Sequence, residues 1–157
     1  MSALAGNLLK AAQARGVTIT TAESCTGGMI SAAITDIAGS SAVFERGFVT
    51  YSNAAKTEML GVSEATLAAH GAVSEEVARE MAQGAKDAAR ADLAVAVTGI
   101  AGPGGSEHKP EGRVCFALAT KDGISSETVE FGAIGRAQVR ANTRGHALQM
   151  LLDALTV

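Results

Sequence analysis

The segment Thr21–Gly28 gathers hydroxyl groups, a thiol and a carboxylate in front of two glycines, between a strand-like run and a helix-like run. Backbone N–H groups at the start of a helix are unpaired and attract negative charge, so nucleophilic side chains beside them can do chemistry. Ser24 and Thr26 can act as nucleophile and assisting hydroxyl, or they can cap the following helix. Cys25 is a rival nucleophile, intrinsically stronger than serine, or a small buried structural residue.

A serine nucleophile requires a base, because its hydroxyl is nearly inert at its free pKa. The three histidines, His70, His108 and His146, lie in no recognisable motif, which leaves a Ser–Lys pair as the alternative. Lys56 stands apart from the other lysines because it follows the predicted strand 43–51 on an Ala-rich turn. It can be a base only if burial or nearby cations lower its pKa; otherwise it is a surface lysine with a solvated amine.

Tyr51 is the only tyrosine and closes the same predicted strand. Its hydroxyl can position Ser24 or Lys56, or the ring can be ordinary core with the hydroxyl at the surface. Both interpretations remain open from the sequence.

Two further features can bind an anion. The loop Gly99–Gly105 offers flexible backbone for close approach to a phosphate or an oxyanion, although it matches neither a Walker loop nor a dinucleotide-binding loop. Arg136 and Arg140 lie four residues apart, hence on one face at the start of a predicted helix. They suit a phosphate or a carboxylate if that face reaches the site, and they are a solvated charge stripe if it does not.

The elements that must position these residues alternate between helices and strands, and a hairpin signal at Asp122-Gly123 comes near the end. This order predicts an α/β fold: a three-layer α/β/α sandwich with a mixed, mostly parallel sheet of about five strands. Helices are expected at 4–14, 29–37, 52–60, 63–70, 74–91 and 136–154, and strands at 17–21, 43–51, 93–97, 113–120 and 125–131.

Ligands of such sheets lie beyond the carboxyl ends of the strands. If the strands 17–21 and 93–97 are parallel neighbours, Ser24 and the loop Gly99–Gly105 face one crevice. The sequence therefore predicts a single site at this edge of the sheet.

Composition narrows the function classes. The chain of 157 residues fits one domain, residues 1–157, and its 47% hydrophobic residues predict an ordered globular protein. A net charge of −3 and only 3% aromatic residues argue against nucleic-acid partners. The absence of a long apolar run and of a signal peptide predicts a cytoplasmic protein without a membrane partner. We expect no metal, because no cluster has metal-ligand spacing.

Taken together and in this order, four segments are similar to the CinA C-terminal-domain family, which includes the nicotinamide mononucleotide deamidases. The resemblance extends from about Leu4 to Leu152. Many members carry an additional N-terminal domain, and we expect this chain to be the stand-alone form. The four segments are Thr21–Gly28, Phe48–Lys56, His70–Ser74 and Thr98–Gly105.

The resemblance implies hydrolysis of the carboxamide of nicotinamide mononucleotide by a Ser–Lys site, with no cofactor, in a homodimer. Carried onto this sequence, Ser24 is the nucleophile, Lys56 the base and Tyr51 the orienting hydroxyl. The positive ring is expected to meet Glu23. Further substrate contacts are expected from Thr26, Gly27, Gly28, Thr98, Gly99, Gly102, Gly104, Arg136 and Arg140.

One departure concerns the last helix. The family commonly has Asp before the first arginine, where this chain has Gly135. That difference is compatible with a second hypothesis, a non-catalytic nucleotide-binding or regulatory module. A third hypothesis, a partner in DNA uptake or damage response, conflicts with the acidic charge and the few aromatic residues.

Overall fold

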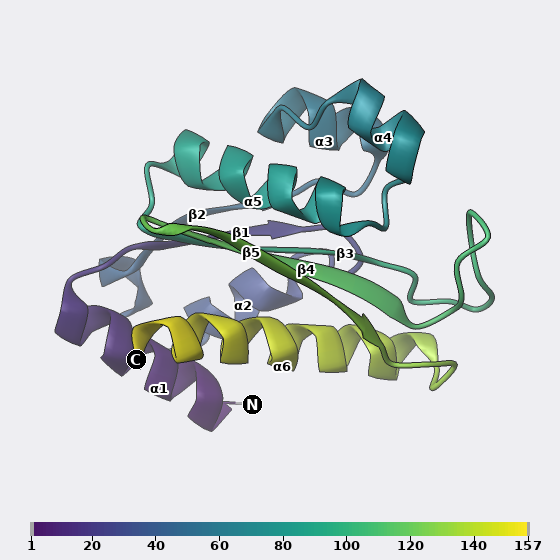
Figure 1. Ribbon diagram of the computed structural model, residues 1–157. Helices are drawn as coiled ribbons and strands as arrows, with labels where there is room; N and C mark the ends of the chain where they lie inside the picture. Colours follow the sequence, from purple (N-terminus) through teal and green to yellow (C-terminus); the bar gives the residue numbers. More distant parts are fainter. Residues whose placement is uncertain (1, 157) are drawn as a thin grey trace.

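The computed structural model describes residues 2–156 and has helices on both faces of one five-stranded sheet (Figure 1). The strands are β1 (Ile19–Glu23), β2 (Phe44–Val49), β3 (Leu93–Gly99), β4 (Arg113–Thr120) and β5 (Gly123–Glu130). The helices are α1 (Ser2–Arg15), α2 (Met29–Thr35), α3 (Asn53–Leu60), α4 (Glu64–His70), α5 (Glu75–Ala89) and α6 (Arg136–Leu155), with a 3₁₀ turn, η1 (Ser40–Ala42).

The strand order is β2-β1-β3-β4-β5. Strand β1 pairs in parallel with β2 and β3, whereas the pairs β3–β4 and β4–β5 are antiparallel. The predicted three-layer α/β/α fold with a mixed sheet of five strands is confirmed. The prediction that the sheet is mostly parallel is wrong: two pairs are parallel and two antiparallel, because β4 and β5 follow β3 through hairpins and not through helices. In the parallel register Glu23 lies opposite Val97, so β1 and β3 end at the same edge.

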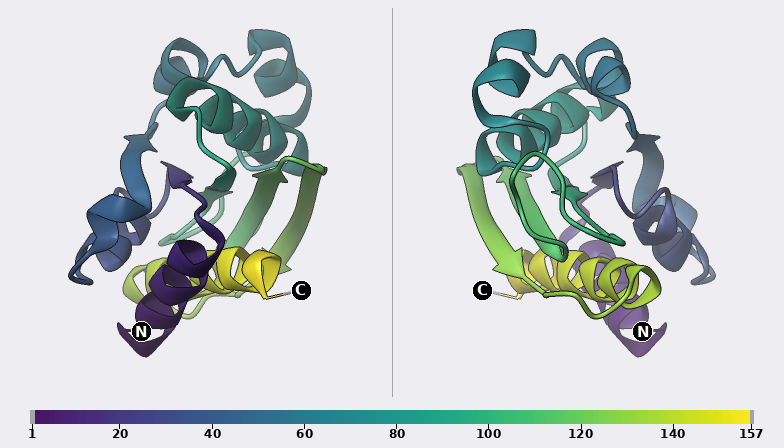
Figure 2. Two further views of the ribbon diagram at one scale, coloured as in Figure 1. Left: turned by 90° about the vertical axis from the view of Figure 1, so that its left-hand side faces the viewer. Right: turned by 90° about the vertical axis from the view of Figure 1, so that its right-hand side faces the viewer.

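The two faces of the sheet carry different side chains. Large apolar residues such as Val95 and Phe116 face the layer of α1, α2 and α6. Small residues such as Ala94, Ala96 and Ala117 face α5, which lets that helix approach the sheet closely. Helices α3 and α4 pack on the outer side of α5, away from the sheet (Figures 1 and 2).

Helix α3 rests on α5 at a glycine. A Cβ atom at Gly84 would lie 1.9 Å from the carbonyl oxygen of Leu60, at the end of α3, so only glycine permits this approach. The contact matters for the site because α3 also carries Lys56.

The main difference from the predicted elements concerns β1, which spans residues 19–23 instead of 17–21. All five of its residues are buried, including Thr20, Thr21 and Glu23. The polar residues predicted to form a turn therefore continue the strand, because their side chains find hydrogen-bond partners inside the fold. Within residues 2–156, no helix has both the length and the apolar character to cross a membrane.

Candidate active site

A cavity of about 320 Å³ lies at the edge where β1 and β3 end. Four connections line it: the turn after β1, the β2–α3 connection, the α4–α5 connection and the loop after β3. Each of the four segments on which the family resemblance rests overlaps one of these connections. Residues distant in sequence thus meet in one crevice, as predicted from the parallel neighbours β1 and β3.

Lys56 is the largest fully buried side chain, with 1% of its surface exposed. Its Nζ lies 3.1 Å from Ser24 Oγ and donates to the backbone carbonyls of Thr50 (3.1 Å) and Tyr51 (3.2 Å). Burial lowers the pKa of Lys56 below its usual 10.5, although the negative charge of Glu107 acts in the opposite direction. The surface-lysine interpretation is therefore wrong.

Glu23 holds the start of α2. Its carboxylate accepts five hydrogen bonds: from the hydroxyls of Thr26 and Ser31 and from the backbone N–H groups of Gly28, Ile30 and Ser31. The side chain is fully buried and is not part of the cavity lining. A carboxylate at a helix N-terminus satisfies unpaired donors and interacts favourably with the helix dipole. Glu23 therefore shapes the turn, and we no longer expect it to meet the ring.

Because Glu23 caps α2, Ser24 is free for another role. The hydroxyl of Ser24 makes no cap contact with α2; the residue lines the cavity and its Oγ faces Lys56. Thr26 supports the cap indirectly by donating to Glu23 at 2.6 Å. The capping interpretation thus fails for Ser24.

Arg140 fixes the same turn from outside the cavity. Its Nε donates to the carbonyl of Cys25 at 3.0 Å, and its Nη2 donates to the carbonyl of Thr26 at 3.2 Å. The backbone N–H groups of Cys25 and Thr26 are separate from these carbonyls. Within residues 2–156, neither N–H group donates a hydrogen bond to another residue. The turn is therefore held while the two amides next to Ser24 donate to no other described residue.

Cys25 lines the cavity but is a poor nucleophile. Burial raises the pKa of its thiol to about 12, and the nearby Glu23 acts in the same direction. The thiolate is the reactive form of cysteine, and with this pKa almost no thiolate is present at neutral pH. The geometry and the pKa both favour Ser24 over Cys25.

Tyr51 and Arg136 form the mouth of the cavity. Tyr51 is 62% exposed, and its hydroxyl accepts from Arg136 Nη2 at 3.3 Å, so the predicted contact with Ser24 is absent. Tyr51 instead positions Lys56 through its backbone carbonyl. Arg136 also donates to the carbonyl of Gly102 at 2.8 Å, which joins the start of α6 to the glycine-rich loop.

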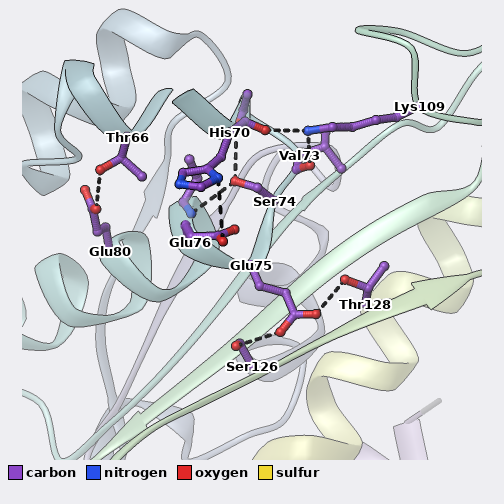
Figure 3. Close-up of polar contacts among 12 residues, drawn as sticks. Thr66, His70, Val73, Ser74, Glu75, Glu76, Glu80, Lys109, Ser126 and Thr128 are labelled. Atoms are coloured by element: carbon purple, nitrogen blue, oxygen red, sulfur yellow. Dashed lines mark hydrogen bonds and ion pairs between the residues drawn. The ribbon is translucent and has the colours of Figure 1, made fainter. Parts of the chain in front are cut away.

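The opposite wall is a strap, residues Ala101–Gly112, which extends the β3–β4 hairpin (Figures 1 and 2). Lys109 fastens it by donating from Nζ to the carbonyls of His70 (2.7 Å) and Val73 (2.5 Å), as Figure 3 shows. At its base, Thr98 donates to the carbonyl of Ala72 at 2.8 Å. These contacts join β3 and the strap to the end of α4 and the α4–α5 connection.

The predicted site residues fall into two groups. Eight line the cavity: Ser24, Tyr51, Lys56, Thr98, Gly99, Gly102, Gly104 and Arg136. Five lie behind it and support the turn or α2: Glu23, Thr26, Gly27, Gly28 and Arg140. Sequence reasoning missed Asn53, Ala72, Val73, Ser106 and Glu107, which also line the cavity.

Three of these five residues could have been found from the sequence. The segments His70–Ser74 and Phe48–Lys56, already singled out, contain Ala72, Val73 and Asn53. Nothing in the local sequence marks Glu107, because its position depends on how the strap folds back. Among residues 2–156, no group of three or more His, Cys, Asp or Glu is placed to hold a metal ion.

Both the sequence and the fold of this chain match known proteins. The model of the CinA C-terminal domain matches residues 1–155. This chain belongs to the CinA C-terminal domain family. The nicotinamide-nucleotide amidohydrolase PncC of Escherichia coli K12 is 61% identical over 143 residues, which cover 90% of this chain and 87% of that relative.

Two solved structures share the fold of this CinA domain over nearly its whole length. The competence/damage inducible protein CihA from Agrobacterium tumefaciens has a TM-score of 0.95 at 49% identity, covering 99% of this chain and 95% of that one. A CinA superfamily protein from Klebsiella pneumoniae has the same TM-score at 39% identity, covering 98% and 96%.

Proposed function

We propose that this chain is a nicotinamide-nucleotide amidohydrolase, which converts nicotinamide mononucleotide and water to nicotinate mononucleotide and ammonia. The observation that carries the proposal is the buried contact of 3.1 Å between Lys56 Nζ and Ser24 Oγ, at the open end of the sheet. The name of the Escherichia coli relative supports the substrate and the reaction.

The surroundings of Lys56 suit a neutral amine. A neutral amine has two protons, which the carbonyls of Thr50 and Tyr51 accept, and one lone pair, which then faces Ser24 Oγ. Burial lowers the pKa of Lys56 and so increases the neutral fraction. Lys56 is thereby oriented as a general base for Ser24.

In the acylation step, the proton of Ser24 passes to Lys56 Nζ while Ser24 Oγ bonds to the amide carbon. The C=O electron pair moves to the oxygen, and the N–H groups of Cys25 and Thr26 stabilise this oxyanion. One such donor contributes about 2.7–4 kcal/mol to lowering the barrier. Arg140 keeps the two amides in place by binding their turn.

Collapse of the intermediate breaks the C–N bond, and the proton on Lys56 passes to the departing nitrogen, so that ammonia leaves. Water then attacks the acyl-enzyme and gives its proton to Lys56, which returns it to Ser24 Oγ. The products are nicotinate mononucleotide and free enzyme. This scheme requires neither a metal nor a cofactor.

Arg136 is placed to bind the phosphate. It lies at the exposed mouth of the cavity, beside Tyr51 and the glycine-rich loop, and lines the cavity itself. Planar guanidinium groups recognise phosphate through two parallel hydrogen bonds. We therefore assign the phosphate to Arg136 and the glycine-rich loop, and retain the homodimer and the cytoplasmic location as part of the proposal.

The test is ammonia release from nicotinamide mononucleotide by the wild type and three variants. We expect Ser24→Ala and Lys56→Gln to lose at least about a thousandfold in kcat/KM, within the range for losing a nucleophile or a general base. Cys25→Ala, the matched control, should stay within about threefold of the wild type, since its thiol takes no part in the chemistry.

Activity that survives Ser24→Ala but disappears in Cys25→Ala would overturn the assignment of the nucleophile. Saturable binding of the nucleotide to the wild type without any ammonia release would favour the non-catalytic module instead.

A further inference from the structure

The charged side chains that line the cavity are few. Among residues 2–156 they are Lys56 on the buried wall, Arg136 at the mouth and Glu107 on the strap. Glu107 is the single carboxylate of this lining. Its negative charge interacts with the Lys56 amine and raises the pKa of Lys56, against the lowering by burial.

Glu107 occupies an unusual position in the backbone. Ser106 and Lys109 exchange two backbone hydrogen bonds of 3.0 and 2.8 Å, so Glu107 and His108 form a two-residue turn. Both central residues have positive φ, 51° and 63°. Such turns favour Asn-Gly, because side chains with a Cβ are strained there. The chain places a glutamate where glycine or asparagine would relieve this strain.

The carboxylate of Glu107 lies against Gly71, beside the Lys109 amine, which is 2.9 Å from the point where a Cβ on Gly71 would be. Its Oε2 lies 2.3 Å from the point where a Cβ on Gly71 would be, so it fits against the bare backbone of that glycine. Lys109 anchors the turn through the carbonyls of His70 and Val73, on either side of Gly71 (Figure 3). The turn therefore places the Glu107 side chain at the cavity, where it remains exposed to solvent.

We propose that Glu107 is a specificity-determining residue that selects carboxamides carried on a positively charged pyridinium ring. This inference rests on the proposed function and deepens it. The substrate has a cationic ring and an anionic phosphate, and the cavity offers one anionic and one cationic group, Glu107 and Arg136, outside the Ser24–Lys56 pair. Such charge complementarity mainly provides specificity.

The same charge favours the substrate over the product. Hydrolysis turns a neutral carboxamide into a carboxylate, so the product carries one more negative charge near the Glu107 carboxylate. Glu107 should therefore weaken product binding. Because Glu107 is exposed, we expect each effect to be about three- to fivefold and to decrease with added salt.

The experiment compares nicotinamide mononucleotide with its reduced form, whose dihydropyridine ring is uncharged but carries the same carboxamide and phosphate. Dissociation constants are measured by calorimetry in a Ser24→Ala background, where no turnover is expected. We expect the oxidised form to bind about three- to fivefold more tightly, and Glu107→Gln to reduce this ratio to nearly one. The same substitution should tighten binding of nicotinate mononucleotide.

His108→Gln is the matched control, because it changes the other central residue of the turn, which is not part of the cavity lining. It should leave the ratio unchanged. A ratio that Glu107→Gln does not alter, or a wild-type ratio near one, would overturn the inference while leaving amidohydrolysis intact. Binding of neither nucleotide would overturn both proposals, and discrimination without ammonia release from the wild type would overturn amidohydrolysis alone.

Discussion

Glu23 and Glu107 belong to two walls of one cavity, and their surroundings are opposite. Glu23 is fully buried behind Ser24 and accepts five hydrogen bonds from the turn after β1 and the start of α2. Glu107 is exposed at the tip of a strained turn, with its carboxylate at the cavity. A carboxylate whose lone pairs are already used by the fold is structural, whereas one left open at a cavity can meet a ligand. Glu23 is adjacent to Ser24 in the sequence and Glu107 is not, yet only Glu107 lines the cavity.

The largest expected effect tests this difference through stability. Removing the Glu23 carboxylate by Glu23→Ala leaves buried donors unpaired, so we expect the free energy of unfolding to fall by about 3–5 kcal/mol. Glu107→Ala should change it by less than about 0.5 kcal/mol, as surface substitutions do. Denaturant unfolding of both variants measures these values. Equal losses in the free energy of unfolding would show that both carboxylates stabilise the fold to the same extent.

A second prediction concerns pH and connects the two walls. Only neutral Lys56 can accept the proton of Ser24, so kcat/KM should rise about tenfold per pH unit on the acidic side and level off below pH 10.5, since burial lowers the pKa of Lys56. Glu107→Gln should move this limb to lower pH, because it removes a negative charge that raises the pKa. A limb at or above 10.5 would contradict the assignment of Lys56.

Stability should follow the same group. Between the lowered pKa of folded Lys56 and 10.5, the unfolded chain binds the proton that the folded chain has lost. The Lys56 contribution to the free energy of unfolding therefore increases as the pH rises through this window. Lys56→Met is the control that should abolish the increase.

The smallest predicted effect lies on the strap. Lys109→Met keeps the length of the side chain but removes its hydrogen bonds to His70 and Val73. We expect KM for nicotinamide mononucleotide to rise about threefold with kcat nearly unchanged, because the proposal gives the strap a role in substrate binding and none in bond breaking. A loss confined to kcat would mean that the strap positions the reacting groups as well.

The sequence predicted the fold and the position of the site because both follow from local patterns. Apolar runs and caps located the elements, and the carboxyl ends of the parallel strands β1 and β3 placed Ser24 opposite the glycine-rich loop. The pairing of Ser24 with Lys56 came mostly from the family resemblance. No periodicity reveals that a lysine on a short helix points inward.

What sequence reasoning could not predict was the direction of individual side chains. Arg136 and Arg140 lie one turn apart on α6, yet one faces the cavity and the other holds the turn behind it. Tyr51 contributes its carbonyl to Lys56 because its ring turns outward. Such choices depend on how the packed elements are rotated, which a pattern of residue types does not encode.

The glycine at the contact between α3 and α5 has a consequence for protein engineering. Gly84 lies on α5, which supports the helix that carries Lys56, and any larger residue there must push the end of α3 outward. Attempts to stabilise α5 by replacing this glycine with alanine, a common strategy for helices, should therefore disturb the position of the Lys56 amine. A library built to raise the melting temperature would do better to leave Gly84 unchanged, because its contact is with the backbone of Leu60.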